Sequence, residues 1–434
     1  MVWATQLVFY GLPWLSVGDR QAMLFDIAAR RFYIFNIVLY PQDLIYLTGL
    51  LVISALSLFL FTAIAGRLWC GYTCPQTVYT EIFMWVERKI EGDRVTRMRL
   101  DKSSLTFEKF ARKSAKHAVW LGIGLWTGFT FVGYFTPIKV LTNEVITWSL
   151  GSWEIFWILF YGFATYGNAG WMREQVCKYM CPYARFQSAM FDRDTLIVTY
   201  DEARGEGRGS RPRSDTPNQY HAKGLGDCID CTLCVQVCPT GIDIRNGLQY
   251  ECISCSACID VCDGVMEKMH YPPGLIRNST QNGVDQNLSS ASMFRRVLRP
   301  RVLIYSAVLG SITIAMLWSL MTRAPLRVDV VRDRGAMARM VGQGEVENVY
   351  RLQIMNATEI NQRYMLSVVG VDGLHIVSGA DVVVEAASAK WFPVRLQIPL
   401  NATAAGTHPI IFMVTAHGVQ EAFATEKSMF LVPR

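Results

Sequence analysis

The sequence predicts an α-helical membrane protein of about five transmembrane helices, with a small cysteine-rich domain inserted and an all-β domain at the C-terminal end. Three observations lead to this fold class. Of the 434 residues, 51% are hydrophobic and 18% charged, whereas roughly 25% are charged in an average soluble protein. All 12 cysteines lie between Cys70 and Cys262. Short runs of alternating apolar and polar residues begin near Val328.

The transmembrane helices are predicted from apolar runs, because about 20 apolar residues span a hydrocarbon core of about 30 Å. The five runs are residues 1–17, 44–66, 118–137, 150–172 and 302–321. Lys and Arg collect in residues 88–117 and again at 295–301. Positively charged loops stay in the cytoplasm. We therefore expect the cytoplasmic segments to be 67–117 and 173–301, and the outer segments to be 18–43, 138–149 and 322–434.

The predicted domains follow from these runs and from changes in composition. They are a membrane domain with four helices (1–200), a Gly- and Arg-rich linker (201–226), the cysteine-rich domain (227–275), a basic juxtamembrane linker (276–301), the fifth transmembrane helix (302–321) and the β domain (325–434). In the last of these, runs such as VENVYRLQIMN alternate with turn residues at regular spacing. That pattern is typical of an antiparallel immunoglobulin-like sandwich, although the cysteine pair of true immunoglobulin domains is missing.

The strongest motif in the sequence is a cysteine run of the form C-x2-C-x2-C-x3-C, which occurs twice. The copies are Cys228, Cys231, Cys234 and Cys238, and Cys252, Cys255, Cys258 and Cys262. This run is typical of bacterial ferredoxins with two 4Fe-4S clusters, in which the fourth cysteine of each run binds the other cluster. We therefore assign one cluster to Cys228, Cys231, Cys234 and Cys262, and the other to Cys252, Cys255, Cys258 and Cys238. Zinc is the competing interpretation, but it needs only four ligands, usually in two separated pairs.

The remaining four cysteines form two C-x3-C-P motifs, each at the expected cytoplasmic end of an apolar run. They are Cys70 and Cys74, followed by Pro75, and Cys177 and Cys181, followed by Pro182. Residues i and i+4 share one helical face, and proline starts a new helix. Four thiols brought together could bind copper(I), form reversible disulfides, hold a further cluster, or simply pack as small apolar groups.

Basic residues accompany both C-x3-C-P motifs. They are Arg67, Arg173, Lys178 and Arg185. Because a neighbouring cation stabilises the ionised form of a thiol, we expect these residues to favour thiolates at the four cysteines.

Residues 66–94, 168–201 and 226–269, which hold all these motifs, resemble the cytochrome c oxidase accessory proteins CcoG, also called FixG or RdxA. The resemblance implies a bacterial inner-membrane protein with cytoplasmic clusters and a periplasmic immunoglobulin-like domain. It implies that the protein reduces Cu(II) to Cu(I) for assembly of a C-type (cbb3-type) haem–copper oxidase. On this chain, Cys70, Cys74, Cys177 and Cys181 would then handle the copper or relay electrons.

Copper ions, copper carriers or oxidase assembly factors, and membrane lipid are the partners that this resemblance implies, and nucleic acid is not among them. The electron donor is expected to be a protein or a quinol, because no G-x-G-x-x-G dinucleotide motif follows a predicted strand. Two other functions stay open at this point. One is an electron-transfer subunit that passes quinol electrons to a partner reductase, and the other is an assembly scaffold with structural clusters.

Overall fold

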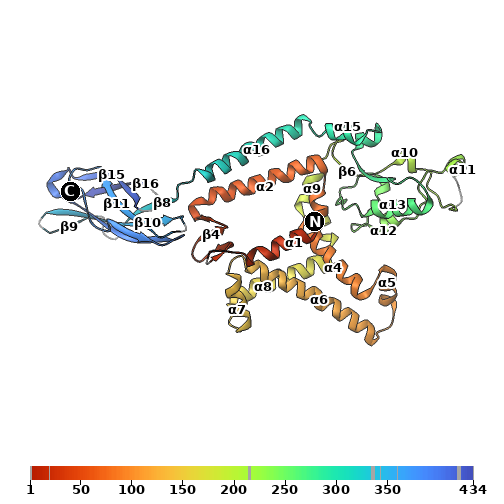
Figure 1. Ribbon diagram of the computed structural model, residues 1–434, viewed down its shortest axis with the longest axis horizontal. Helices are drawn as coiled ribbons and strands as arrows, with labels where there is room; N and C mark the ends of the chain where they lie inside the picture. Colours follow the sequence, from red (N-terminus) through yellow and green to blue (C-terminus); the bar gives the residue numbers. More distant parts are fainter. Residues whose placement is uncertain are drawn as a thin grey trace. The chain divides into compact units, whose positions relative to one another are not determined.

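The computed structural model of the chain consists of two compact units (Figure 1). One comprises Met1–Ser16 and Ile45–Met316, and the other Val17–Leu44 and Leu317–Arg434. The structure describes residues 2–18, 20–213, 217–333, 338–342, 344–358, 360–417 and 422–433. Residues 214–216 of the predicted linker lie outside this described part.

The first unit is largely helical as far as the cysteine-rich domain. Its helices are α1 (Val2–Gly11), α2 (Leu44–Ala65), α3 (Leu68–Tyr72), α4 (Pro75–Glu91), α5 (Arg94–Lys102), α6 (Phe107–Val132), α7 (Ile138–Ile146), α8 (Ser152–Thr165) and α9 (Pro182–Ser188). Two wider π-helical segments, η3 (Tyr166–Met172) and η4 (Val176–Met180), connect α8 to α9. A short 3-10 turn, η1 (Leu12–Trp14), follows α1. The helix α16 (Pro300–Met321) closes the unit.

Two helices of the described chain are long and apolar enough to cross a membrane, by length and composition. They are Pro41–Ala65, which contains α2, and α16. The two run antiparallel, since a Cβ added at Gly49 would meet the sulfur of Met316 near one end. At the other end, Arg299 donates a hydrogen bond to the carbonyl of Ala63.

The other three predicted spans differ from the expected boundaries and remain predictions. The first predicted span holds a helix of only 10 residues, α1, followed by the 3-10 turn η1. In α6 the apolar part, residues 118–132, covers about 22 Å at a rise of about 1.5 Å per residue, which is short of a bilayer core. The fourth is divided, because α8 ends after 14 residues and the chain continues as the π-helical η3.

The helices α6 and α8 pack backbone to backbone through glycine (Figure 1). A Cβ added at Gly124 would lie 2.6 Å from the carbonyl oxygen of Gly162, and one at Gly128 only 2.2 Å from that of Ile158. Small residues four apart allow this close approach, as in helix pairs within membranes.

We predict that Gly128→Ala destabilises the protein by about 1–3 kcal/mol, because the added methyl group overpacks the contact with α8. Gly122 on the same helix has no atom within 4 Å of the position of an added Cβ. Gly122→Ala should therefore leave stability unchanged or raise it slightly, since alanine favours helix. Thermal unfolding of the detergent-purified protein, followed by circular dichroism, compares the two. Equal melting temperatures would contradict the packing argument.

The cysteine-rich domain is built on a two-stranded antiparallel ribbon of β6 (Ile197–Tyr200) and β7 (Ile276–Ser279). Between these strands lie α10 (Glu202–Gly205), α11 (Pro217–Ala222), α12 (Leu233–Val237), η5 (Ile244–Asn246) and α13 (Ala257–Met269). The short helices α14 (Gln281–Asp285) and α15 (Ser290–Arg295) lead on to α16. Buried Tyr220, Met266 and Leu275 pack with the cysteines in one core.

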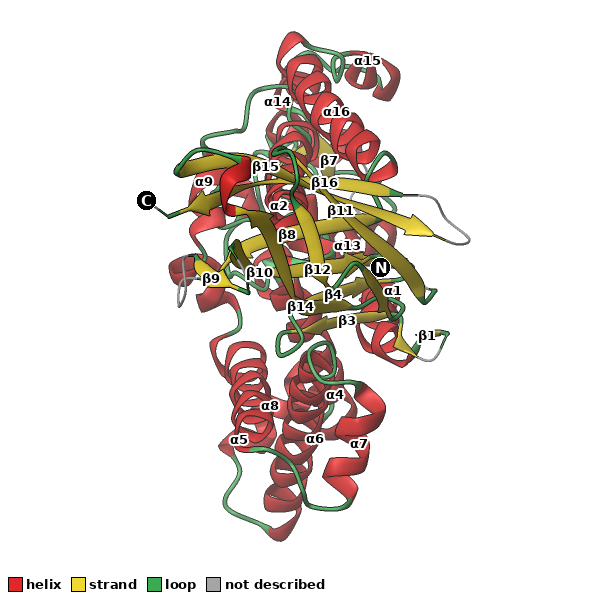
Figure 2. Cartoon of the chain, turned by 90° about the vertical axis from the view of Figure 1, so that its left-hand side faces the viewer, coloured by secondary structure: helices red, strands yellow, loops and turns green. Residues whose placement is uncertain are grey.

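The second unit contains an antiparallel sandwich of two sheets (Figure 2). One sheet has the order β12-β14-β10-β8, with β9 paired to β10, and the other has the order β13-β11-β15-β16. The strands are β8 (Leu326–Arg332), β9 (Arg339–Val341), β10 (Glu345–Asn356), β11 (Gln362–Val369), β12 (His375–Ser378), β13 (Asp381–Val384), β14 (Ala389–Pro399), β15 (Gly406–His417) and β16 (Phe423–Val432). A 3-10 turn, η6 (Leu400–Ala402), follows β14. Buried Tyr350, Leu352 and Phe412 belong to its core, so the predicted β domain is a sandwich.

Residues 18–43 were expected only as an outer loop, but strands within this segment pack on the sandwich. The strands β3 (Met23–Asp26), β4 (Arg31–Ile34) and β5 (Ile37–Leu39) form a three-stranded sheet. Its Leu24, Tyr33 and Val38 share a core with Met355 and Ala387 of the β domain. The strand β1 (Ser16–Val17) precedes this segment, which also includes β2 (Arg20–Gln21) and the 3-10 turn η2 (Pro41–Asp43). The strands are too short for alternation to predict them.

Asp43 ties the residues before α2 to those after α16. Its side chain is fully buried and forms ion pairs of 2.6 Å with Arg323 and 2.7 Å with Arg327. The side chain of Arg323 is itself only 9% exposed, and it also donates to the carbonyl of Val38. A buried charge costs several kcal/mol without a partner, so this ion pair stabilises the junction.

We predict that Asp43→Ala lowers the free energy of unfolding by about 3–5 kcal/mol, because two arginines lose a buried partner. The matched control is Asp381→Ala, which breaks the pair with Arg363 on the surface of the sandwich, where both side chains are at least 40% exposed. Exposed pairs contribute little, so the control should unfold like the parent protein in a thermal melt. Equal losses of stability in both variants would show that burial of the ion pair does not explain the effect of Asp43→Ala.

Candidate electron-transfer site

The two cysteine loops of the inserted domain have the same unusual backbone. Asp230 and Thr232 in the first loop have φ values of 54° and 55°, and Ser254 and Ser256 in the second have 53° and 62°. Left-handed conformations are rare for residues other than glycine, especially for a β-branched threonine. Such strain persists where the surrounding structure imposes it, and it clusters at functional sites. The repeat in sequence is therefore also a repeat in conformation.

Each loop curls around its own cavity. One cavity is lined by Cys228, Cys231, Cys234 and Cys262, and the other by Cys238, Cys252, Cys255 and Cys258, with Cys234 also at its edge. We call them the Cys228 cavity and the Cys252 cavity.

The residues at both cavities fit a 4Fe-4S cluster. The four thiols assigned to a cluster line each cavity, one of them from the other half of the domain, and the rest of each lining is largely apolar. Within the described part of the chain, no three His, Cys, Asp or Glu side chains lie close enough to hold a single metal ion. Thiols at the corners of a cubane stand farther apart than the ligands of one zinc ion.

The two C-x3-C-P motifs have the local structure that their sequences predict. Helix α4 begins at Pro75 and helix α9 at Pro182, so a new helix starts directly after Cys74 and after Cys181. Before these breaks, Cys70 lies in the single turn of α3, and Cys177 lies in the π-helical turn η4.

The four cysteines of these motifs lie within electrostatic range of one another, although no three of them stand close enough to hold one metal ion without a shift of the side chains. The thiol of Cys70 interacts electrostatically with those of Cys74, Cys177 and Cys181, and Cys177 interacts with Cys74 and Cys181. We call this group the four-cysteine site. Cys70 also donates a weak hydrogen bond, 3.4 Å long, to the side-chain oxygen of Gln187.

Reciprocal hydrogen bonds hold the two motifs together. Gln76, which follows Pro75, donates to the carbonyl oxygens of Asn168 at 2.9 Å and of Arg173 at 3.0 Å. In the opposite direction, Arg67 donates to the carbonyl of Ala184 in α9. Each motif is therefore hydrogen-bonded to the segment that flanks the other motif. Gln76 could not be predicted from the sequence, because a single glutamine after a proline gives no signal of a partner 92 residues away.

The expected cations around the thiols are only partly present. Arg67 is buried and interacts with Cys70, Cys177 and Cys181, whereas Arg173 bonds to Glu87 at 3.2 Å. The Arg185 side chain lies outside the described part.

The expectation of thiolates at this site is wrong for Cys70 and Cys177. Burial and the Cys74 thiol raise the pKa of Cys70 to about 12, against the opposing effect of Arg67. Burial raises the pKa of Cys177 to about 11. Ionisation of these two thiols at neutral pH would therefore need a bound metal ion, which displaces the proton.

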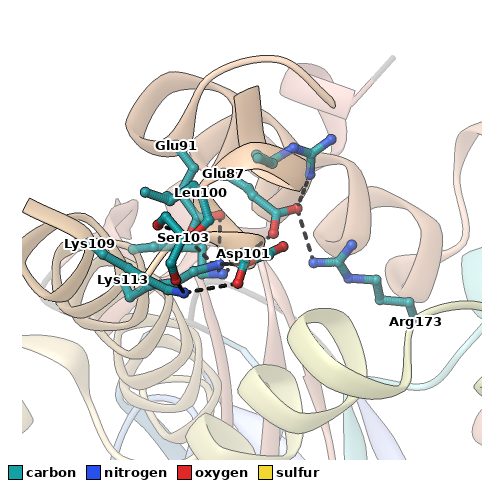
Figure 3. Close-up of polar contacts among 10 residues, drawn as sticks. Glu87, Glu91, Leu100, Asp101, Ser103, Lys109, Lys113 and Arg173 are labelled. Carbon is teal, nitrogen blue, oxygen red and sulfur yellow. Dashed lines mark hydrogen bonds and ion pairs between the residues drawn. The ribbon is translucent and has the colours of Figure 1, made fainter. Parts of the chain in front are cut away.

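A network of buried charges supports the second motif from α4 (Figure 3). Glu87 forms ion pairs with Arg97 at 2.5 Å, Arg173 at 3.2 Å and Lys116 at 3.5 Å. Lys116 also pairs with the buried Glu91 at 2.9 Å. Burial alone would raise the pKa of Glu87, but Arg173, Arg97 and Lys116 together outweigh it and hold the pKa below its usual range.

An open pocket gives access to one thiol of the site. It is lined by Tyr179, Met180, Cys181, Pro182, Phe186 and Ala189. Its walls combine aromatic rings with two sulfur atoms, one from a thiol and one from a thioether. A soft metal ion could reach Cys181 from this side.

Comparison with known proteins is consistent with this geometry. A family profile described as "4Fe-4S dicluster domain" matches residues 172–281, and one described as "4Fe-4S binding domain" matches residues 47–92. A third, the "IG-like fold at C-terminal of FixG", matches residues 316–433. The cavities and these matches define the chain as an iron–sulfur electron-transfer protein.

Relatives of known name resemble most of the chain. It is 39% identical over 398 residues to the nitrogen fixation protein FixG of Rhizobium meliloti, covering 84% of this chain and 75% of that protein. It is 40% identical over 372 residues to protein RdxB of Cereibacter sphaeroides, covering 83% and 76%. Protein RdxA of the same organism is 38% identical over 375 residues, covering 83% and 77%. The chain therefore belongs to the FixG/RdxA family.

Among solved structures, a FixG-related protein from Vibrio parahaemolyticus is 26% identical to this chain. The match covers 25% of this chain and 97% of that one, with a TM-score of 0.23.

We predict that Glu87→Gln destabilises the protein at pH 7, because three cations lose their shared carboxylate. A carboxylate with a lowered pKa contributes stability that is complete above its ordinary pKa of about 4.3. That contribution is lost as the pH falls through the lower pKa of the folded protein. Melting temperatures of parent and variant should therefore differ at pH 7 and converge in acid.

The control for this prediction is Glu108→Gln, which removes an exposed carboxylate paired with Arg112 four residues later. It should melt like the parent protein at every pH, since exposed pairs contribute little. A difference between parent and Glu87→Gln that stays constant into strong acid would contradict the assigned charge.

Proposed function

We propose that this protein reduces Cu(II) to Cu(I) at the four-cysteine site and so supplies copper for assembly of a C-type (cbb3-type) haem–copper oxidase. The observation that carries the proposal is that four thiols from two distant motifs lie within electrostatic range of one another, with Cys181 lining an open pocket. Thiolates are soft ligands, which favour copper(I), the product of the reaction.

The dicluster domain would provide the electrons. Cys228, Cys231, Cys234 and Cys262 would hold one cluster, and Cys238, Cys252, Cys255 and Cys258 the other. When bound, such clusters supply one electron at a time, which matches the single electron that Cu(II) requires. The protein's own part is to hold the copper next to that source. Gln76 and Arg67 keep the four thiols together, and metal binding displaces the thiol protons.

We further propose that the protein lies in the bacterial inner membrane, with the dicluster domain in the cytoplasm and the sandwich in the periplasm. The arginines at the start of α16, among them Arg299 and Arg301, support this orientation, because basic residues remain inside. Since α2 and α16 are antiparallel, the segments before α2 and after α16 would emerge on the same side. The sandwich is then free to bind oxidase assembly factors or a copper carrier.

A second candidate function is electron transfer from a quinol to a partner reductase. The pocket at Cys181 favours it to some degree, because Tyr179 and Phe186 offer aromatic surfaces to a planar ring. The same two aromatic side chains would be indifferent to copper. Dependence of electron flow on copper therefore separates the two functions.

The test is to purify the protein anaerobically in detergent, reduce it, and mix it with one equivalent of Cu(II). Two signals are followed together: reoxidation of the protein, by its visible absorbance, and formation of Cu(I) at a chelator. We expect Cu(I) to form as the protein is oxidised. In the Cys74→Ala/Cys181→Ala variant the rate should fall at least about tenfold, since even outer partners of a metal site are worth about 10–100-fold.

The control is Asp381→Ala, whose substituted side chain is on the surface of the sandwich, with iron content measured in every sample. It should keep the parent rate. If Cu(II) leaves the reduced protein untouched, or if the cysteine variant performs like the control, copper is not the substrate of this site. Oxidation of a quinol by the same preparation would then favour the second function.

A further inference from the structure

The first C-x3-C-P motif lies directly against one of the two cluster loops. Gly71 follows Cys70, and a Cβ added to it would lie 2.8 Å from the carbonyl oxygen of Ile253 and 2.9 Å from that of Ser254. Those two residues follow Cys252 in the sequence. Only glycine permits this approach, since real Cβ atoms are not found so close to backbone. The motif and the loop of the Cys252 cavity therefore touch backbone to backbone.

A buried cation, Arg67, interacts with both the four-cysteine site and the Cys252 cavity. Arg67 is 2% exposed and interacts electrostatically with Cys70, Cys177 and Cys181 on one side and with Cys252 on the other. Its Nε atom is buried and has no hydrogen-bond partner among the described residues, and none of them forms a salt bridge with it. A buried guanidinium without a carboxylate is costly, and metal-bound thiolates on both sides would supply the missing negative charge.

The cation at the Cys228 cavity differs from Arg67 because it is paired with carboxylates. Arg245 lines it with a side chain 8% exposed. Two carboxylates already neutralise Arg245, with Asp230 at 2.6 Å and Asp243 at 2.7 Å. Cys231 of this cavity is exposed, so this end of the domain is open to a donor in solution.

We propose that the Cys252 cavity is the one that delivers electrons to the four-cysteine site, and that Arg67 is the positioning residue that joins the two. The Cys228 cavity, with its exposed cysteine, is then the entry point. The proposal rests on the proposed function and adds the direction of electron flow. In the final step one electron leaves the Cys252 cavity and one Cu(II) ion becomes Cu(I), with no proton transferred.

The test uses the full-length protein with its clusters loaded, in a redox titration followed by electron paramagnetic resonance. Arg67→Met removes one positive charge next to the Cys252 cavity, so the reduction potential of one cluster signal should fall while the other stays. Arg67→Lys keeps the charge and should largely restore the parent value. Arg245→Met removes a positive charge at the Cys228 cavity and should lower the potential of the other signal alone, which assigns the two.

A second variant tests the contact independently of the charge. Gly71→Ala forces the motif and the loop apart, so oxidation of the protein by Cu(II) should slow at least about tenfold while both potentials stay near the parent values. The matched control is Gly264→Ala in α13, where an added Cβ meets nothing within 4 Å. If the Arg67→Met protein does not take up its clusters, the comparison of Gly71→Ala with Gly264→Ala tests the proposal.

The outcomes separate this proposal from the proposed function. A potential shift confined to one signal in Arg67→Met supports the route even if Cu(II) is never reduced, in which case only the choice of copper fails. Equal shifts of both signals, or none, overturn the route. It is also overturned if Arg67→Met and Arg245→Met move the same signal, or if Gly71→Ala transfers electrons as fast as Gly264→Ala.

Discussion

Hydrogen bonds between two distant motifs are the constraint on which the rest of the site depends. Arg67 and Gln76 each donate to a backbone carbonyl of the opposite motif, across 117 and 92 residues of chain. The carbonyl of Asn168 also accepts from the backbone N–H of Arg173 at 2.7 Å, so Gln76 adds a second donor to it. The prolines that end each motif start α4 and α9 directly after its second cysteine, and the side chains of Arg67 and Gln76 hold the two motifs near each other.

The region around the second motif contains more buried charged side chains than stability alone would favour. A buried ion pair often contributes no more than well-packed apolar residues would. Glu87, Glu91 and Lys116 are all buried nevertheless, and the network they form reaches Arg173 just before the second motif. Their shared effect is to fix where η4 begins, and thus where Cys177 stands. Arg67 differs from them, since its charge has no carboxylate partner and faces sulfur.

The second unit shows how a small segment can depend on a large domain. The three strands within residues 17–44 are each three or four residues long, too few to be stable alone. They persist because Leu24 and Tyr33 are buried against Met355 of the sandwich. Asp43 then links the end of this segment to the first strand of the sandwich through Arg327, so the two parts act as one unit.

The sequence by itself determined the chemistry of this protein. The spacing of eight cysteines predicted how they divide between two clusters, because crossing ligands are a property of that run, and in the structure the same cysteines line the two cavities. Apolar runs predicted α2 and α16, since length and hydrophobicity are local properties. Alternation predicted the sandwich for the same reason.

Only the tertiary structure decided how these parts meet. Gln76, Glu87 and the contact of Gly71 with the Cys252 loop depend on residues far away in the sequence, and no local pattern records such partners. The ionisation of Cys70 followed the same rule, because burial outweighs the nearby arginine, and burial is decided by packing. Residues 17–44 formed a sheet only through a partner domain that begins some 280 residues later in the chain.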